Sequence, residues 1–264
     1  MSAAAEARQS ELDRALDAQG VGSALAAELF AVADLLKGQP TLRNALADPN
    51  TPDDRRRELA DGVLGSRISA AANTVVGAAA ALRWGGSSGI VAALERQGIR
   101  ALLVDAQAAG KLDTVEDELF RFSRTVAGDP ALQAALDDRV APTSARQQLV
   151  TDLLKERTYA GTVELATRAA VSTSRAYAVK LAEYLKLAAA LRIRAIAKVT
   201  VARPLTPEQR DRLRVVLVRQ LRREVNLQVV VDPTVLGGAR VNVGDEMIEG
   251  TVAGKLVAAE KQLI

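Results

Sequence analysis

Two stretches of this sequence, residues 29–48 and 119–138, are versions of one another shifted by 90 residues. The first reads LFAVADLLKGQPTLRNALAD and the second reads LFRFSRTVAGDPALQAALDD. The shared positions are Leu29, Phe30, Gly38, Pro40, Leu42, Ala45, Leu46 and Asp48 in the first copy, and Leu119, Phe120, Gly128, Pro130, Leu132, Ala135, Leu136 and Asp138 in the second. Because glycine and proline recur together with the apolar positions, we expect one helical fold to occur twice. Chance similarity between two leucine-rich helices is the alternative.

The helix breaks fall at the same places in both copies. Gly38 and Gly128 are expected to end a helix in the left-handed conformation, and a proline two residues later suits the start of a short helix. Thr51, ahead of Pro52, is the expected cap of the next helix, and Ser144 is its counterpart in the second copy.

The composition favours a mainly α fold with a small α/β domain at its end. Apolar residues make up 48% of the 264 residues but aromatic residues only 3%, so the core must be built largely from Ala, Leu and Val. The repeat and the alanine-rich helices predict two tandem helical bundles, residues 1–95 and 96–194. Residues 195–264 follow as a third domain of different pattern, and RWGGSSG at 83–89 is expected to be a bend.

The last domain begins with a strand, a helix and a second strand. The β-branched segment AIAKVTVA predicts a strand from Ile196, and LQVVVD at 227–232 predicts another. Between them, Thr206, Pro207 and Gln209 form a capping box that predicts a helix start. The two strands should be parallel, since they are joined by a helical crossover.

The remaining C-terminal residues predict a short β-ribbon and a final helix. Two strands are expected on either side of a Gly244–Asp245 turn, with Val241 and Val243 on one face. A helix should then begin near Thr251.

The helix over residues 206–223 is amphipathic and strongly basic. Its apolar stripe is expected to consist of Leu213, Val216, Leu217 and Leu221. The basic side chains on its other side are Arg210, Arg212, Arg214, Arg219, Arg222 and Arg223. Residues 192–264 carry a net charge of +5 and the rest of the chain −2, which favours an acidic partner for the last domain. A solvated face, a protein-docking face and a nucleic-acid face all fit, but no aromatic platform accompanies the arginines.

Residues that carry chemistry are nearly absent. The chain has no Cys and no His, which excludes disulfides, thiolate nucleophiles, Cys/His metal sites and histidine acid–base catalysis. GGARVNVG lacks the spacing of a phosphate-binding loop. The carboxylates at 53–54 and 116–118 are expected to cap helices. We therefore expect no catalytic residues, no metal and no cofactor.

The sequence also predicts where the protein works. The first 20 residues lack the apolar core of a secretory signal, and the alanine-rich stretch 68–82 is too short to span a bilayer and is expected to be a buried helix. The expected location is the cytoplasm.

The strongest signal is a resemblance in the last domain. Residues 199–256, VTVARPLTPEQRDRLRVVLVRQLRREVNLQVVVDPTVLGGARVNVGDEMIEGTVAGKL, closely resemble the C-terminal signature of the delta subunit of F-type ATP synthases, the bacterial counterpart of the oligomycin-sensitivity-conferring protein. The matching positions include Ala202, Leu205, Thr206, Val225, Asp232, Pro233, Leu236, Gly237, Gly238, Val241, Gly244, Asp245, Ile248, Gly250, Lys255 and Leu256. The usual Asp-Gly-Ser is Glu249-Gly250-Thr251 here. The second copy resembles the family's six-helix N-terminal bundle, and the first looks like the duplicated bundle of longer actinobacterial delta subunits.

The resemblance implies a stator subunit without catalytic activity. Family members bind the N-terminal helices of the alpha subunits through the helical bundle and the end of the b-subunit stalk through the C-terminal domain. This implies a peripheral protein at the cytoplasmic face of the cell membrane, held there only through the complex. The partner-binding residues expected from the motif and the basic helix are Leu236, Gly237, Gly238, Gly250, Lys255, Arg219 and Arg222. The alternative from composition alone is a basic helical nucleic-acid-binding protein. Which bundle binds the alpha subunits is left open.

Overall fold

A computed structural model describes most of the chain, which divides into two compact units, residues 1–185 and 186–264. The described residues are 3–20, 22–172, 176–194, 196–221, 226–235, 238–243 and 246–249. Each unit is described by itself. The protein is mainly α, as the sequence predicts. The division into three domains at residues 95 and 194 stays a prediction.

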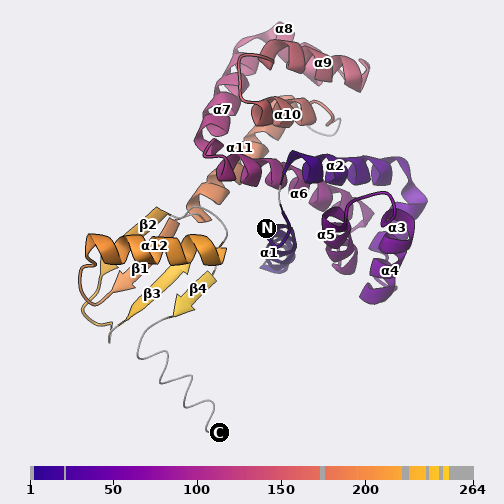
Figure 1. Ribbon diagram of the computed structural model, residues 1–264. Coiled ribbons are helices and arrows are strands. Elements are labelled where there is room, and N and C mark those ends of the chain that lie inside the picture. The colour runs from indigo at the N-terminus through magenta and orange to yellow at the C-terminus, as the bar shows by residue number, and fades with distance from the viewer. Residues whose placement is uncertain are drawn as a thin grey trace. The chain divides into compact units, whose positions relative to one another are not determined.

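The first unit is helical (Figure 1). Its helices are α1 (Ala3–Asp17), α2 (Ser23–Gly38), α3 (Pro40–Ala47), α4 (Asp53–Leu64), α5 (Ala70–Ala81), α6 (Ser87–Ala108), α7 (Leu112–Gly128), α8 (Pro130–Asp137), α9 (Thr143–Leu154), α10 (Ala160–Ala169) and the first part of α11 (Tyr177–Arg194).

The repeat is present in the structure. Helices α3, α4, α5 and α6 begin 90 residues before α8, α9, α10 and α11, at Pro40 and Pro130 for the first pair. The buried apolar residues of the first copy include Leu29, Leu36 and Leu46, and those of the second include Leu119, Val126 and Leu136. The 90-residue shift therefore relates helix starts and buried core positions as well as residue identities.

Polar contacts inside the two copies repeat as well. The Glu28 carboxylate accepts hydrogen bonds from the backbone N–H and the hydroxyl of Ser69, at 3.0 and 2.5 Å. In the second copy Glu118 accepts from the backbone N–H of Tyr159 and the hydroxyl of Thr162, at 3.0 and 2.6 Å. Each glutamate thus holds the start of α5 or α10 from a distant helix. The prediction that Glu118 caps its own helix is wrong, because α7 already begins at Leu112.

Each copy contains a buried arginine that donates hydrogen bonds to backbone carbonyls. Arg56, only 1% exposed, donates to the carbonyls of Ala80 and Ala81, both at 2.6 Å, and to those of Asp48 and Thr51. Its counterpart Arg146, 3% exposed, donates to the carbonyl of Ser172. The carbonyls at the end of a helix carry partial negative charge, so they compensate the buried guanidinium of Arg56.

Helix α6 connects the two copies without a break. It runs from Ser87 to Ala108, across residue 95, and twelve of its residues are buried. By the 90-residue shift the start of α6 corresponds to the start of α11, and the Asp-Ala-Gln at 105–107 corresponds, by a shift of 88 residues, to the Asp-Ala-Gln at 17–19 that begins at the end of α1. One helix therefore serves as the last helix of one copy and the first helix of the next.

The expected glycine and hydroxyl caps are wrong. Among the described residues, positive φ angles occur at Gly110, Gly238 and Glu156, and not at Gly38 or Gly128. A single residue separates α2 from α3, and a proline follows it, which forces that residue to extended backbone and leaves no room for a left-handed turn.

The hydroxyl caps fail because proline itself precedes each helix. Pro52 and Pro142 precede α4 and α9, and neither helix start has a side-chain cap. Thr51 instead donates its hydroxyl to the Asp48 carboxylate at 2.8 Å. Other local predictions are confirmed: Asp53 and Asp54 lie in the first turn of α4, and α5 is a helix with one buried face.

From residue 196 on, the described part of the second unit is a four-stranded sheet with helix α12 (Pro207–Leu221) on it (Figure 1). Strand β1 (Ile196–Val201) pairs in parallel with β2 (Asn226–Val231) and antiparallel with β3 (Ala239–Val243), which pairs with β4 (Glu246–Glu249). Helix α12 crosses from β1 to β2. The predicted strands and their parallel pairing are confirmed.

The core of this unit lies between α12 and one face of the sheet. Val199, Val201 and Val241 from the strands contact Leu217 from the helix, and all four are at most 4% exposed. The Thr206–Gln209 capping box is confirmed, with reciprocal hydrogen bonds of 3.0 and 3.3 Å. The Gly244–Asp245 turn, the side chain of Val243 and the helix expected from Thr251 lie outside the described residues.

Candidate protein-docking surfaces

The outer ridge of α12 combines exposed valines with arginines. Leu213 and Leu217 point to the sheet, so at 100° per residue the opposite side of the helix carries Val215, Arg219 and Arg212, and Val216 lies on the flank next to Arg212. Val215 is 66% exposed and Val216 55% exposed. The prediction that Val216 belongs to the buried stripe is wrong, because the stripe follows the i, i+4 pair of leucines and Val216 lies outside that arc. We call Arg212, Val215, Val216 and Arg219 the α12 ridge.

The loop after β2 is held by its first residue. The backbone N–H of Asp232 donates to the Val201 carbonyl at 2.8 Å, which joins the ends of β2 and β1. The Asp232 carboxylate accepts from the hydroxyl and the N–H of Thr234, at 2.7 and 2.9 Å, and these bonds lower the pKa of that carboxyl. Gly238 ends the loop with φ of 81°, a conformation that favours glycine. The described start of the loop, residues 232–235, is therefore a hydrogen-bonded turn.

The structure places two of the seven expected partner-binding residues. Arg219 is exposed on the α12 ridge, and Gly238 is exposed at the end of the loop. Leu236, Gly237, Arg222, Gly250 and Lys255 lie outside the described residues. The role of all seven stays a prediction. The exposure of Val215 and Val216 was not predicted from the sequence, because only basic residues were assigned to the outer side of this helix.

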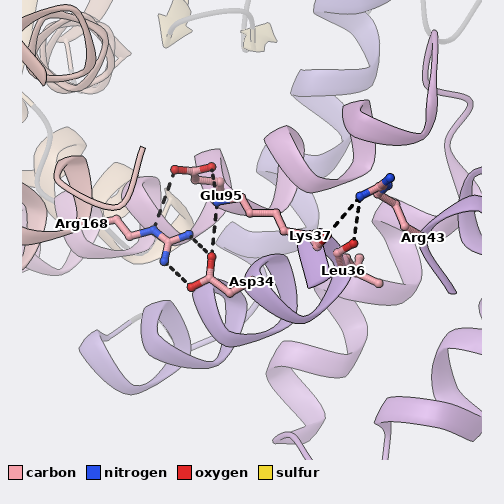
Figure 2. Close-up of polar contacts among 6 residues, drawn as sticks. All are labelled: Asp34, Leu36, Lys37, Arg43, Glu95 and Arg168. Atoms are coloured by element: carbon pink, nitrogen blue, oxygen red, sulfur yellow. Dashed lines mark hydrogen bonds and ion pairs between the residues drawn. The ribbon is translucent and has the colours of Figure 1, made fainter. Parts of the chain in front are cut away.

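A second polar centre joins the two helical copies (Figure 2). Arg168 on α10 donates to both carboxylate oxygens of Asp34 on α2, at 2.6 and 2.9 Å. Its Nε lies 3.8 Å from Glu95 on α6, and Lys37 lies 3.3 Å from both Asp34 and Glu95. Arg168 is only 7% exposed. We call Arg168, Asp34, Lys37 and Glu95 the Arg168 cluster.

An aromatic contact lies under the cluster. The Arg168 guanidinium lies over the ring of Phe30, with its central carbon 4.5 Å from the ring centroid. The same ring lies against the backbone of α6, since a Cβ added at Gly98 would be 2.4 Å from Phe30. A cation over an aromatic face is attracted by the ring quadrupole, more strongly where water is excluded. Residues 30 and 168 thereby fasten α2 of the first copy to α10 of the second.

The charges of the cluster support one another. Burial opposes ionisation of Asp34, but the hydrogen bonds and charge of Arg168, with Lys37, outweigh it and lower the pKa of Asp34. Burial also opposes the charge of Arg168, yet Asp34 and Glu95 outweigh it and raise the arginine's pKa. Both groups are therefore charged at neutral pH, which keeps the ion pair intact.

The chain has no Cys and no His, so neither surface carries a thiol or an imidazole. No cluster of three or more Asp or Glu side chains suited to a metal ion occurs in the part of the chain that the structure describes. In that same part, no helix is both long and apolar enough to cross a membrane. The α12 ridge offers exposed apolar side chains beside charged ones, a combination suited to binding other polypeptides.

The fold defines the class: a mainly α protein in which a tandem helical repeat is joined to a small mixed α/β unit. Residues 99–263 match the family described as the ATP synthase delta (OSCP) subunit. The chain belongs to this family.

Full-length relatives agree with the family match. The chain is 44% identical to the ATP synthase subunit delta of Parafrankia sp. (strain EAN1pec), over 90% of this chain and 86% of that one. It is 41% identical to the subunit delta of Kineococcus radiotolerans, over 97% and 94% of the two chains. It is 43% identical to that of Streptomyces avermitilis, over 98% and 96%. Because these matches span nearly the whole chain, they include the first helical copy, which precedes the residues of the family match. Membership in this family fits a peripheral-stalk subunit of an F-type ATP synthase.

Proposed function

We propose that this protein is the stator subunit that links the catalytic head of a proton-translocating F-type ATP synthase to its b-subunit stalk and resists the torque of the rotor. The observation that carries the proposal is family membership over nearly the whole chain. The helical copies bind N-terminal helices of the alpha subunits, and the α/β unit binds the end of the b subunit. The protein itself catalyses no reaction and takes no cofactor.

The α12 ridge supports the second contact. Val215 and Val216 supply exposed apolar area, and Arg212 and Arg219 lie one turn before and after them. An amphipathic helix with acidic residues beside its apolar stripe complements such a ridge. The same valines weigh against a nucleic-acid face, where phosphate contacts come from polar and basic groups and bases stack on aromatic ones. The residues Leu236, Gly237, Gly238, Gly250, Lys255, Arg219 and Arg222 are proposed to contribute to this contact.

The Arg168 cluster supports a mechanical role for the helical part. A subunit under torque must transmit force between the ends of its own chain, and the cluster ties α2, α6 and α10 together across the two copies. The ion pair holds a defined geometry because Arg168, which is 7% exposed, would be poorly solvated without its acidic partners. The protein is proposed to act at the cytoplasmic face of the membrane, attached through the complex.

Removal of residues 195–264 tests the proposal. In inverted membrane vesicles, the shortened chain should leave ATP hydrolysis by the head intact and abolish ATP-driven proton pumping. The double substitution V215D/V216D in the full chain should weaken the same coupling, whereas Arg55→Ala, a change at an exposed surface ion pair, should not. Full coupling in the shortened variant would show that the α/β unit does not bind the stalk.

A further inference from the structure

The two edges of the sheet in the second unit differ in how they are protected. The strand order is β2-β1-β3-β4, so β2 and β4 are the edge strands (Figure 1). Strand β4 is four residues long, and its sequence, EMIE, contains two glutamates. Strand β2 is six residues long, and its sequence, NLQVVV, contains no charged residue and no proline. Short length, charge and proline keep edge strands from pairing with other chains, and β2 has none of these features.

The backbone of β2 has one side that β1 does not use. The N–H of Asp232 donates to the Val201 carbonyl at 2.8 Å, and alternate residues of a parallel strand bond to the same neighbour. The even-numbered residues of β2 therefore bond to β1. The N–H and C=O groups of Leu227, Val229 and Val231 point away from β1, to a side on which no strand of the described residues pairs with β2.

The side chains along this edge are apolar on both faces of the sheet. Leu227 and Val229 pack against the core under α12, and Val231, on the same face by alternation, is 45% exposed. Val230 points to the other face and is 37% exposed. Free main-chain groups beside exposed valines complement another extended strand of uncharged, β-branched residues.

A second copy of β2 has this chemistry. In an antiparallel pairing about a twofold axis at Val229, each Val229 lies opposite its counterpart, and each Leu227 lies opposite Val231 of the other copy. The outward N–H and C=O groups then meet as hydrogen-bonded pairs at every one of these positions. Val231 gains an apolar cross-strand neighbour, and no charged side chain of β2 meets a like charge.

We propose that the unassembled chain associates in pairs through β2, antiparallel about Val229, so that two four-stranded sheets become one continuous sheet. The α12 ridge faces away from the sheet and stays accessible in the pair. One strand per copy is a small interface, so the association is weak and depends on concentration. Residues 192–264 carry a net charge of +5, so the two copies repel each other less as salt is added. The pairing does not depend on the stator function.

Sedimentation velocity of the full-length chain at increasing concentration tests the pairing. The average mass should rise from that of one chain toward that of two. Val231→Pro removes one outward N–H from each copy, and so two hydrogen bonds from the pair, which should weaken association about 5- to 150-fold. Val230→Lys places a charge on each edge and should also weaken it. The same change at Val140, which is 93% exposed in the first unit, should leave association unchanged.

Hydrogen exchange shows which side of β2 is covered. In dilute chain the amides of Gln228 and Val230 should be protected by β1, in the wild type and in the Val231→Pro variant, which shows that the sheet is intact. The amides of Val229 and Val231 in the wild type should exchange rapidly in dilute chain and become protected at high concentration.

Three results would overturn the pairing. The first is the mass of a single chain at every concentration, or equal association of the wild type and both β2 variants. The second is protection of Val229 and Val231 in dilute chain, which would mean that residues 250–264 of the same chain cover the edge. The third is association that disappears as salt is added, which would indicate bridging by nucleic acid.

Discussion

Replacing Arg168 with alanine should loosen the junction between the two helical copies. The guanidinium makes two hydrogen bonds to the Asp34 carboxylate and covers the Phe30 ring. Hydrogen bonds to charged groups contribute about 1.5–3 kcal/mol, and the lower end applies here because the Asp34 side chain is 44% exposed and regains water. The contact with the ring adds about 0.5–2 kcal/mol. The expected loss in the free energy of unfolding is about 2–4 kcal/mol.

Urea and thermal unfolding of the full chain, followed by circular dichroism, measure this loss. For a unit of this size, each kcal/mol lowers the midpoint by about 2–4 °C, so Arg168→Ala should unfold about 4–16 °C below the wild type. Arg121→Ala is the matched control, since it removes an arginine from an exposed ion pair with Asp117 and should cost less than about 0.5 kcal/mol.

A double-mutant cycle with Asp34→Asn separates the ion pair from the packing of the arginine stem. The two changes should be non-additive by about 1 kcal/mol or more, because both remove the same contact. Equal stabilities for Arg168→Ala and Arg121→Ala, or full additivity with Asp34→Asn, would refute the account of the junction.

Three further changes have defined outcomes. Gly98→Ala should destabilise the chain by about 1–3 kcal/mol, because its Cβ would lie 2.4 Å from Phe30. Gly77→Ala, with nothing within 4 Å of the added Cβ, should instead stabilise the chain by about 0.5–1 kcal/mol. Urea titration of the two variants measures the difference, and equal effects would contradict the packing at α6. Burial of Asp13 opposes its ionisation, but ion pairs with arginines on α6 lower its pKa from 3.8 to about 2. The stabilisation from Asp13, about 2 kcal/mol, should therefore be complete above pH 5 and be lost as the pH falls from about 4 to 2. Asp13→Asn should flatten that part of the stability profile, and an unchanged profile would contradict the role of these ion pairs. Thr206→Ala should cost about 1 kcal/mol of stability in the second unit, measured by hydrogen exchange in α12, and unchanged exchange would show that the capping box contributes nothing.

Local signals in the sequence predicted much of the fold correctly. The capping box at Thr206, the β-branched strands and the helix starts at Pro40 and Pro130 depend on neighbouring residues, and the structure shows all of them. The 90-residue shift also relates the two buried arginines Arg56 and Arg146, which both donate to backbone carbonyls.

What the sequence did not predict depends on contacts between distant residues. Arg168 and Asp34 are separated by 134 residues, and nothing near either one indicates the pairing. The continuity of α6 across residue 95 was missed because the repeat was read as two separate copies, whereas one helix belongs to both. Repeat positions alone also could not show that Phe30 is covered and Phe120 is not, since that difference arises from the neighbouring copy.

The most direct test of the stator function is reconstitution of coupling with the purified chain. Membrane vesicles carrying a synthase that lacks this subunit are mixed with increasing amounts of the protein, and ATP hydrolysis and ATP-driven proton uptake are measured together. Hydrolysis should be present from the start, and proton uptake should rise from zero to saturation at one copy of the chain per head. Full proton uptake in the absence of the chain would contradict the account.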